Sequence, residues 1–317
     1  MTRERAPQTA STIPRRSALI FGGVLLILFI AGSVADYSLA NALYTPDNAF
    51  GTVLAAYGEA PALLALVAAG TLAVTARPPV HMVLRWLLII GGAGLIIVGT
   101  LALIIRPEEY WALPAIVRTL IALALSAAAI WATARFSAGA TWQAMCTLAA
   151  ALFAVVALEM VLVQGVKIFW ERPRMRMLAE TGAEFSPWWS PGYEDRDALT
   201  AQGVESSEFK SFPSGHSANA ATLMMLTGFA LLREDFRRHT ARLFWIGAAW
   251  ALLVALSRLS IGAHFLTDTA AGLTFTFVVV LIVSVLAVKV LDAELLDRLP
   301  RGGPRPAPAP RHGRATH

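Results

Sequence analysis

The sequence predicts an all-α membrane protein, a polytopic helical bundle of about eight transmembrane helices with both termini in the cytoplasm. Three observations lead to this fold class. Charged residues make up only 15% of the 317 residues and hydrophobic residues 56%, whereas soluble domains carry about 25% charged residues. Several apolar runs approach the roughly 20 residues that a helix needs to cross a bilayer. Basic residues also alternate along the chain in the way that sets membrane orientation.

Eight apolar runs are candidate spans, of which the second and sixth are short. They cover about residues 17–35, 60–76, 83–105, 112–134, 142–168, 217–232, 243–260 and 265–289. A core helix of a large soluble protein could imitate one such run, but not eight. The predicted division of the chain is an N-terminal cytoplasmic tail (1–16), a transmembrane domain (17–290) and a basic, Pro-rich, disordered cytoplasmic tail (291–317).

The basic residues predict the orientation. The loop at 35–59 carries no Lys or Arg, whereas the loop at 233–242 and both tails are rich in arginine. The positive-inside rule then places the long loop at 169–216 outside a multi-pass protein of the cell membrane. The net charge of +5 therefore reflects topology, and we expect no nucleic-acid partner. The segment from Arg15 to Ala35 could also be a signal peptide with a cleavage site.

Two polar clusters fall at predicted outer ends of spans. The first, KIFWERPRMR at 167–176, could consist of interfacial anchors whose charged ends reach water. The second, FPSGHS at 212–217, could be a capping turn with an incidental histidine. It could equally bind an anion, because free backbone N–H groups at a helix start attract anions and Ser214 adds a hydroxyl.

A third cluster, SRLSIGAHFLTD at 257–268, lies at the same predicted side of the membrane. His264 and Asp268 are four residues apart, which on a helix places both side chains on one face. A carboxylate beside one imidazole nitrogen fixes the tautomer and makes the other nitrogen a better nucleophile or base. The alternative is an interfacial histidine followed by an ordinary helix-start aspartate.

Together the three clusters indicate one anion site. Its candidate members are Lys167, Arg174, Ser214, Gly215, His216, Arg258, His264 and Asp268. The cations outnumber the carboxylate, which suits a multiply charged oxyanion such as phosphate. Two histidines and one aspartate could also bind a metal, but three flanking cations disfavour a divalent ion. We therefore expect no metal and no cofactor.

The clusters resemble the signature of the type-2 phosphatidic acid phosphatase superfamily, which reads Lys-x6-Arg-Pro, Pro-Ser-Gly-His and Ser-Arg-x5-His-x3-Asp. Lys167 and Arg174 have the required spacing, although Met175 stands where the pattern has Pro. The segments 213–216 and 257–268 match fully. Arg172-Pro173 would give a shorter gap, so Arg174 is the residue assigned to the motif.

The resemblance implies metal-free hydrolysis of a phosphate ester or pyrophosphate through a phosphohistidine. His264 would attack phosphorus, Asp268 would hold and stabilise His264, and His216 would protonate the leaving oxygen and then activate water. The phosphate would be bound by Lys167, Arg174, Ser214, Gly215 and Arg258. The expected substrate is a lipid phosphate within the membrane, such as undecaprenyl pyrophosphate, phosphatidic acid or phosphatidylglycerol phosphate, with no obligatory protein partner.

Other functions remain open on the sequence alone. The same residues would serve a phosphotransferase that passes the phosphoryl group to an acceptor other than water. A non-catalytic lipid or anion transporter would need no paired nucleophile and acid, and a haloperoxidase would not need eight spans. The loop at 177–211 could cap the site or rest on the membrane interface through its aromatic residues. Arg118 and Glu159 lie at similar depth, so we expect them to form a structural ion pair.

Overall fold

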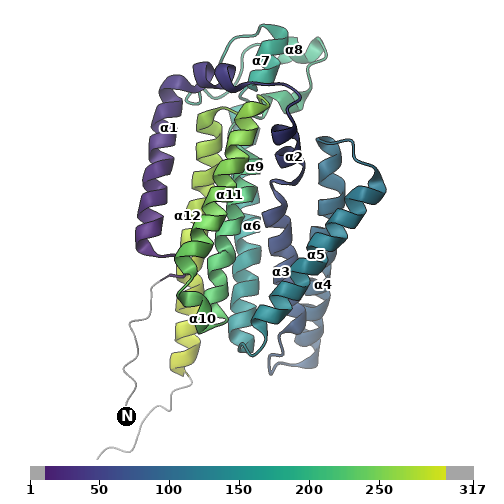
Figure 1. The fold of residues 1–317 in the computed structure, drawn as a ribbon, viewed down its shortest axis with the longest axis vertical. Coiled ribbons are helices and arrows are strands. Elements are labelled where there is room, and N and C mark those ends of the chain that lie inside the picture. The colour runs from purple at the N-terminus through teal and green to yellow at the C-terminus, as the bar shows by residue number, and fades with distance from the viewer. Residues whose placement is uncertain (1–10, 298–317) are drawn as a thin grey trace, which may run out of the picture.

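The computed structural model describes residues 11–297, and every regular element in that part of the chain is a helix. Long helices run side by side, and the short helices α7 (Met175–Thr181) and α8 (Arg196–Ala201) lie over one end of the bundle (Figure 1). The predicted all-α class is confirmed. Of the C-terminal tail predicted to be disordered (291–317), residues 291–297 are instead the end of α12, and residues 298–317 lie outside the described residues.

The described helices are long and apolar enough to make this a multi-pass membrane protein. The long ones are α1 (Arg15–Leu43), α3 (Ala60–Thr75), α4 (Met82–Ile105), α5 (Ala115–Ser137), α6 (Trp142–Trp170), α11 (Thr240–Ser260) and α12 (Leu266–Asp297). The short helix α2 (Ala49–Tyr57) directly precedes α3 and shares its span. Within residues 11–297, 7 segments meet the length and hydropathy needed to cross a membrane.

The predicted span at 217–232 is helical but is not among those seven. It consists of α9 (Gly215–Ala221) followed by the 3₁₀-helix η3 (Thr222–Leu231). A 3₁₀-helix rises about 2.0 Å per residue and an α-helix about 1.5 Å, so this short segment extends roughly 30 Å, the thickness of the hydrocarbon core. The predicted total of eight crossings requires this segment to cross the membrane in addition to the seven spans within residues 11–297.

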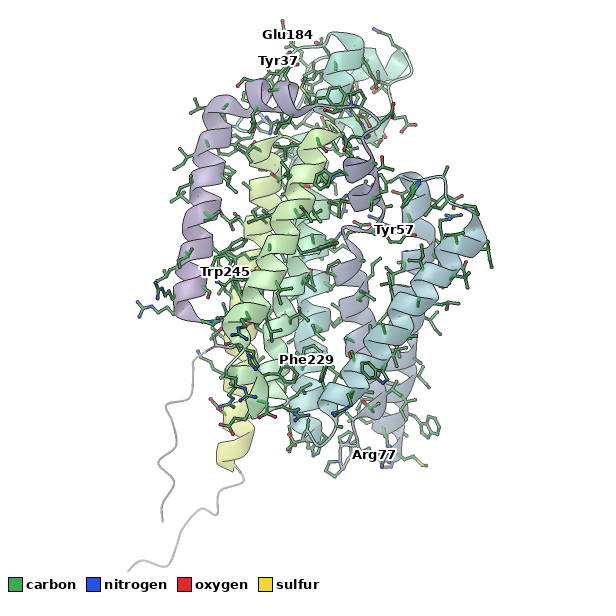
Figure 2. All side chains as sticks on the ribbon, in the orientation of Figure 1. Tyr37, Tyr57, Arg77, Glu184, Phe229 and Trp245 are labelled. Atoms are coloured by element: carbon green, nitrogen blue, oxygen red, sulfur yellow. The ribbon has the colours of Figure 1, made fainter. Side chains whose placement is uncertain are left out.

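The polar loop between α6 and α9 and the arginine-bearing loops lie at opposite ends of the bundle. Figure 2 places Glu184 and Tyr37 near one end, and Arg77 at the other. In Figure 1, helix α10 (Glu234–Arg237) and the start of α1 lie toward the Arg77 end. This alternation is the one expected from the basic residues, and which end faces the cytoplasm stays a prediction.

The predicted Arg118–Glu159 ion pair is wrong. Arg118 Nη1 instead donates to Glu108 Oε2 at 2.5 Å, because the 3₁₀-turn η1 (Arg106–Glu109) brings an acidic residue back over the start of α5. Glu159 is buried, and its Oε2 has no hydrogen-bond partner among the described residues. The similar depth of Arg118 and Glu159 along their helices is therefore not enough to identify the partner of Arg118.

Candidate active site

The predicted site residues come from five separate segments that meet at the α7–α8 end of the bundle. Lys167 lies in the last turn of α6 and Arg174 directly precedes α7. Ser214 is the N-cap of α9, and Arg258 lies in the last turn of α11. Asp268 is in the first turn of α12.

Two close backbone approaches hold these segments together. The Ser214 amide donates to the Asp268 carbonyl at 2.9 Å. A Cβ atom added at Gly272, one turn further along α12, would lie 2.3 Å from the Ser214 carbonyl oxygen, so only glycine permits this packing. A Cβ at Gly215 would lie 3.7 Å from Lys167 Nζ. Gly272 thus lets the Pro-Ser-Gly-His turn pack against α12, and Gly215 lies in ordinary contact range of Lys167 on α6.

His264 is held by a backbone carbonyl. Its Nδ1 donates to the Ser211 carbonyl at 2.6 Å, whereas Asp268 Oδ2 is 3.9 Å away, beyond hydrogen-bonding distance. The expected helical i,i+4 geometry does not form, because α12 begins at Leu266 and His264 lies in the preceding loop. The tautomer is still fixed: Nδ1 carries the proton and the lone pair of Nε2 is left for chemistry.

Asp268 caps the helix that follows His264. Its Oδ2 accepts the Phe265 amide at 2.8 Å and the Ser211 hydroxyl at 2.5 Å. A side chain at the third helical position that bonds back to the residue before the helix is half of a capping box. Asp268 is therefore connected to His264 through Ser211. The Ser211 hydroxyl donates to Asp268, and the Ser211 carbonyl accepts a hydrogen bond from the imidazole N–H. Ser211 is a site residue that the sequence motifs do not contain.

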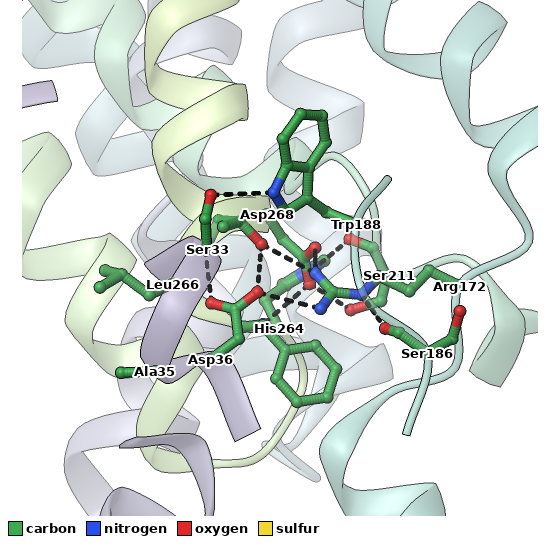
Figure 3. Close-up of polar contacts among 12 residues, drawn as sticks. Ser33, Ala35, Asp36, Arg172, Ser186, Trp188, Ser211, His264, Leu266 and Asp268 are labelled. Carbon is green, nitrogen blue, oxygen red and sulfur yellow. Dashed lines mark hydrogen bonds and ion pairs between the residues drawn. The ribbon is translucent and has the colours of Figure 1, made fainter. Parts of the chain in front are cut away.

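A buried arginine completes the surroundings of Asp268 (Figure 3). Arg172 is fully buried, and its Nη1 donates to Asp268 Oδ1 at 2.5 Å. Its Nη2 donates to Asp36 Oδ2 at 2.9 Å, and its Nε donates to the Ser186 carbonyl at 2.9 Å. Asp36 belongs to α1 and also accepts the Thr267 amide at 2.9 Å. Arg172 thus ties α1 and the loop between α7 and α8 to the start of α12.

The imidazole of His264 is kept neutral by its environment. It is almost completely buried, at 1% exposure. Burial, reinforced by the positive charges of Lys167, Arg174 and Arg258, holds its pKa well below the usual 6.5, against the opposing effect of Asp268. A neutral imidazole with a free Nε2 is a nucleophile at neutral pH.

Several buried guanidinium nitrogens near this histidine have no hydrogen-bond partner within residues 11–297. They are Nε and Nη1 of Arg258 and Nε of Arg174. Arg174 approaches Glu208 only to 3.7 Å, whereas Arg176 makes a two-point contact with the same carboxylate. Buried charged donors normally find acceptors, so these nitrogens are suited to an anion.

Ser214 also keeps a donor available. Its Oγ accepts the hydroxyl of Ser217 at 3.0 Å and the Ser217 amide at 3.4 Å, so its own hydroxyl hydrogen is not used in these bonds. The group is completely buried at the start of α9. The hydroxyl is therefore placed to donate to an oxyanion beside Gly215.

The second histidine, His216, lies among residues from the N-terminal half of the chain. Its Nε2 is 3.0 Å from the Ala55 carbonyl and 4.0 Å from Glu59 Oε2. The ring of Tyr110 packs edge-on against the imidazole at 5.0 Å between centroids. Since a carbonyl only accepts, Nε2 carries a proton, and Nδ1 is the nitrogen that can exchange one.

The loop that joins α6 to α9 covers part of this end. The indole N–H of Trp188 donates to Ser33 Oγ at 2.9 Å, and the ring stacks 6.3 Å from Phe212, beside the Pro-Ser-Gly-His turn. Trp189 is 58% exposed. One tryptophan therefore packs over the site, and its neighbour keeps the exposure expected of an interfacial anchor.

Comparison with known proteins matches residues 144–291 to the model of the PAP2 superfamily. This segment contains all eight predicted site residues in the arrangement described above. Residues 144–291 are therefore a segment similar to the PAP2 superfamily. The matched segment begins within α6, so Asp36, Glu59 and Tyr110 lie outside it. Glu59 and Tyr110 nevertheless contact His216, and Asp36 contacts Arg172.

Two curated relatives are similar over part of this chain. A phosphatidylglycerophosphatase B of Bacillus subtilis is 38% identical over 71 residues, which is 22% of this chain and 34% of the relative. A phosphatidylglycerophosphatase B of Haemophilus influenzae is 45% identical over 60 residues, 18% of this chain and 24% of the relative. The chain therefore spans about a third or less of each relative's length. No solved structure matches.

Within the described residues, no group of three or more His, Cys, Asp or Glu side chains is arranged to hold a metal ion. The carboxylates nearest the two histidines are engaged by arginines: Asp268 by Arg172, and Glu59 by Arg106 at 2.6 Å. The donors that remain without partners are cationic. The chemistry of the site thus fits an oxyanion better than a divalent cation.

Proposed function

We propose that this protein is a metal-independent phosphatase that hydrolyses a lipid phosphate or prenyl pyrophosphate through a phosphohistidine intermediate. The active site would face the extracytoplasmic side of the membrane. The observation that carries the proposal is the buried, neutral His264, whose Nδ1–H is bonded to Ser211, beside the unpartnered guanidinium nitrogens of Arg174 and Arg258.

In the first step, Nε2 of His264 forms a bond to phosphorus while the bond from phosphorus to the leaving oxygen breaks. His216 gives the proton on Nδ1 to that oxygen. Arg174, Arg258 and Lys167 stabilise the charge on the three remaining phosphoryl oxygens. As His264 becomes positive, its Nδ1–H bond to Ser211 strengthens, and Asp268 at 3.9 Å stabilises the charge.

In the second step, water attacks phosphorus and its proton passes to Nδ1 of His216. The N–P bond breaks, and its electron pair returns to Nε2 of His264, which leaves inorganic phosphate and the starting enzyme. The relatives named phosphatidylglycerophosphatase B make phosphatidylglycerol phosphate the first substrate to test. The apolar helices around the site suit a substrate whose tail stays in the bilayer.

The test is phosphate release by the protein purified in detergent, with EDTA present, from phosphatidylglycerol phosphate, phosphatidic acid and undecaprenyl pyrophosphate. We expect release from at least one lipid and a loss of about 10³-fold or more in His264→Ala, since the nucleophile is gone. His81→Asn, at an exposed histidine that precedes α4, should keep full activity. Phosphate release by His264→Ala equal to that of the parent would overturn the phosphohistidine. Transfer to an added alcohol without phosphate release would make the protein a phosphotransferase.

A further inference from the structure

Glu59 is a buried carboxylate that none of the PAP2 motifs contains. It precedes α3 at the break between α2 and α3, is 3% exposed, and lies outside the matched residues 144–291. A carboxylate of this kind inside an apolar bundle is costly unless it is paired. The groups that contact the Glu59 carboxylate therefore indicate its role.

Three groups from two segments, η1 and α9, surround the Glu59 carboxylate. Arg106 Nε donates to Oε1 at 2.6 Å, and Asn219 Nδ2 donates to Oε2 at 3.1 Å. The remaining neighbour is His216, whose Nε2 lies 4.0 Å from Oε2. Arg106 and Asn219 fix the carboxylate from both sides, and Asn219 lies one turn after His216 on α9. The carboxylate thus has a fixed position relative to the imidazole.

Burial and two nearby arginines disfavour a proton on His216, and the Glu59 carboxylate acts against them. The groups that act on it are Arg258 from α11, Arg106 from η1, Glu59 before α3 and the Ala55 carbonyl of α2, with Tyr110 packed on its ring and Lys167 of α6 beside Gly215. Both arginines repel a protonated imidazole, and Glu59 is the carboxylate that attracts it. A general acid has to carry that proton before it can give it away.

We propose that Glu59 is the positioning residue for the proton of His216: its negative charge stabilises the protonated imidazole, which the Ala55 carbonyl orients, so that His216 can act as the acid for the leaving group. With Nε2–H bonded to the Ala55 carbonyl, the mobile proton is on Nδ1. It moves from Nδ1 to the leaving oxygen in the first step and from water to Nδ1 in the second. Glu59 remains ionised throughout and touches neither substrate nor phosphorus. The role of His216 as an acid rests on the proposed function. The position of the Glu59 carboxylate beside the imidazole does not depend on that function.

The decisive measurement is the pH at which His216 loses its proton, followed by NMR of the protein labelled with ¹⁵N-histidine in detergent. The His216→Asn variant identifies its signals among those of the 6 histidines. Removing an opposite charge at this distance should lower the transition by about one to three pH units in Glu59→Gln. Glu59→Asp keeps the charge and should restore most of the shift.

Two further variants separate this role from a structural one. Arg106→Gln removes a repelling cation, so His216 should keep its proton to higher pH, the opposite of Glu59→Gln. The side chain of Arg106 is 42% exposed, which makes the change tolerable even if Glu59→Gln does not fold. Glu108→Gln, at a carboxylate that is 68% exposed and paired with Arg118, is the control and should move nothing. An unchanged transition in both Glu59→Gln and Arg106→Gln would overturn the proposal.

Activity gives an independent readout. Glu59→Gln should reduce kcat by at least about 10-fold for a lipid phosphate, whose alkoxide needs a proton, and much less for an aryl phosphate that leaves without one. Equal loss on both substrates would contradict the assignment. An inactive parent protein, or an active His264→Ala, would refute the proposed function and leave the NMR result to decide the position of the Glu59 charge. The two proposals can therefore fail separately.

Discussion

Gly272→Ala tests whether the packing of α12 on the Pro-Ser-Gly-His turn sets the geometry of the active site. The new Cβ would meet the Ser214 carbonyl oxygen at 2.3 Å, the carbonyl carbon at 3.2 Å and the Ser214 nitrogen at 3.4 Å. These are backbone atoms, so no side-chain rotation relieves the contact. Ordinary contact needs about 1 Å more separation, which would stretch the bond between the Ser214 amide and the Asp268 carbonyl.

The expected cost has a structural and a catalytic part. Overpacking of this kind costs typically 1–3 kcal/mol, partly offset by the roughly 1 kcal/mol that Ala gains over Gly in a helix. A displacement of about 1 Å between catalytic groups can cost about 10²-fold in rate. We therefore expect a modest fall in Tm and a fall of about 10²-fold in kcat. Moving α12 separates His264 and Asp268 from Ser214 and His216.

Gly94→Ala in α4 is the matched control, because a Cβ there meets nothing within 4 Å. It should keep the parent kcat and gain slightly in Tm from helix propensity. Phosphate release is measured on the lipid that the parent hydrolyses, with thermal unfolding in the same detergent. A Gly272→Ala protein with parent kcat would refute the reasoning, since it would mean that the clash relaxes without moving the catalytic groups.

Two further predictions concern the buried arginine and the orientation. Arg172→Met should destabilise the fold by about 3–5 kcal/mol, because it leaves the buried carboxylates of Asp36 and Asp268 without their shared partner. A Tm equal to that of the parent would contradict this, and Arg85→Met, at an exposed position, is the control. Glu205→Cys places a thiol at an exposed position of the loop that joins α6 to α9. It should react with a membrane-impermeant reagent in intact cells, in a Cys146→Ser background, whereas a reaction only after lysis would place the active site in the cytoplasm.

The residues that the motifs single out meet at one end of the bundle, and their spacing within each motif is local. Each cluster lies within about a dozen residues, and each falls at the end of an apolar run that sequence alone identifies. The meeting of the clusters followed from the alternation of the spans, which puts the ends of α6 and α11 and the starts of α9 and α12 on one side. The hydropathy of the sequence predicts where these helices begin and end. In the structure, the segments lie in contact at one end of the bundle, as the alternating direction of the spans predicts.

The parts that sequence could not predict depend on contacts between distant segments. Asp36 and Arg172 are separated by 136 positions, and Glu59 and Asn219 by 160. The spacing of the motif selects Arg174 and gives no function to Arg172. His264 was expected on the helix, but the Asp268 side chain accepts the Phe265 amide and α12 begins after it. A spacing of four residues cannot distinguish two positions on a helix from a loop residue and a capping residue.

The two carboxylates that sequence reasoning missed occupy corresponding places around the two histidines. Asp36 on α1 reaches His264 through Arg172, Asp268 and Ser211, and Glu59 before α3 contacts His216 at 4.0 Å. Both come from the part of the chain that precedes the segment matched to the PAP2 superfamily. Asp36 is paired with Arg172, which also holds Asp268, and Glu59 is paired with Arg106 beside His216. In the proposed mechanism, Asp36 thus helps to position the start of α12 after His264, and the negative charge of Glu59 helps His216 to carry its proton among the phosphate-binding cations. The first helices are therefore part of the catalytic apparatus that we propose, in addition to anchoring the domain in the membrane.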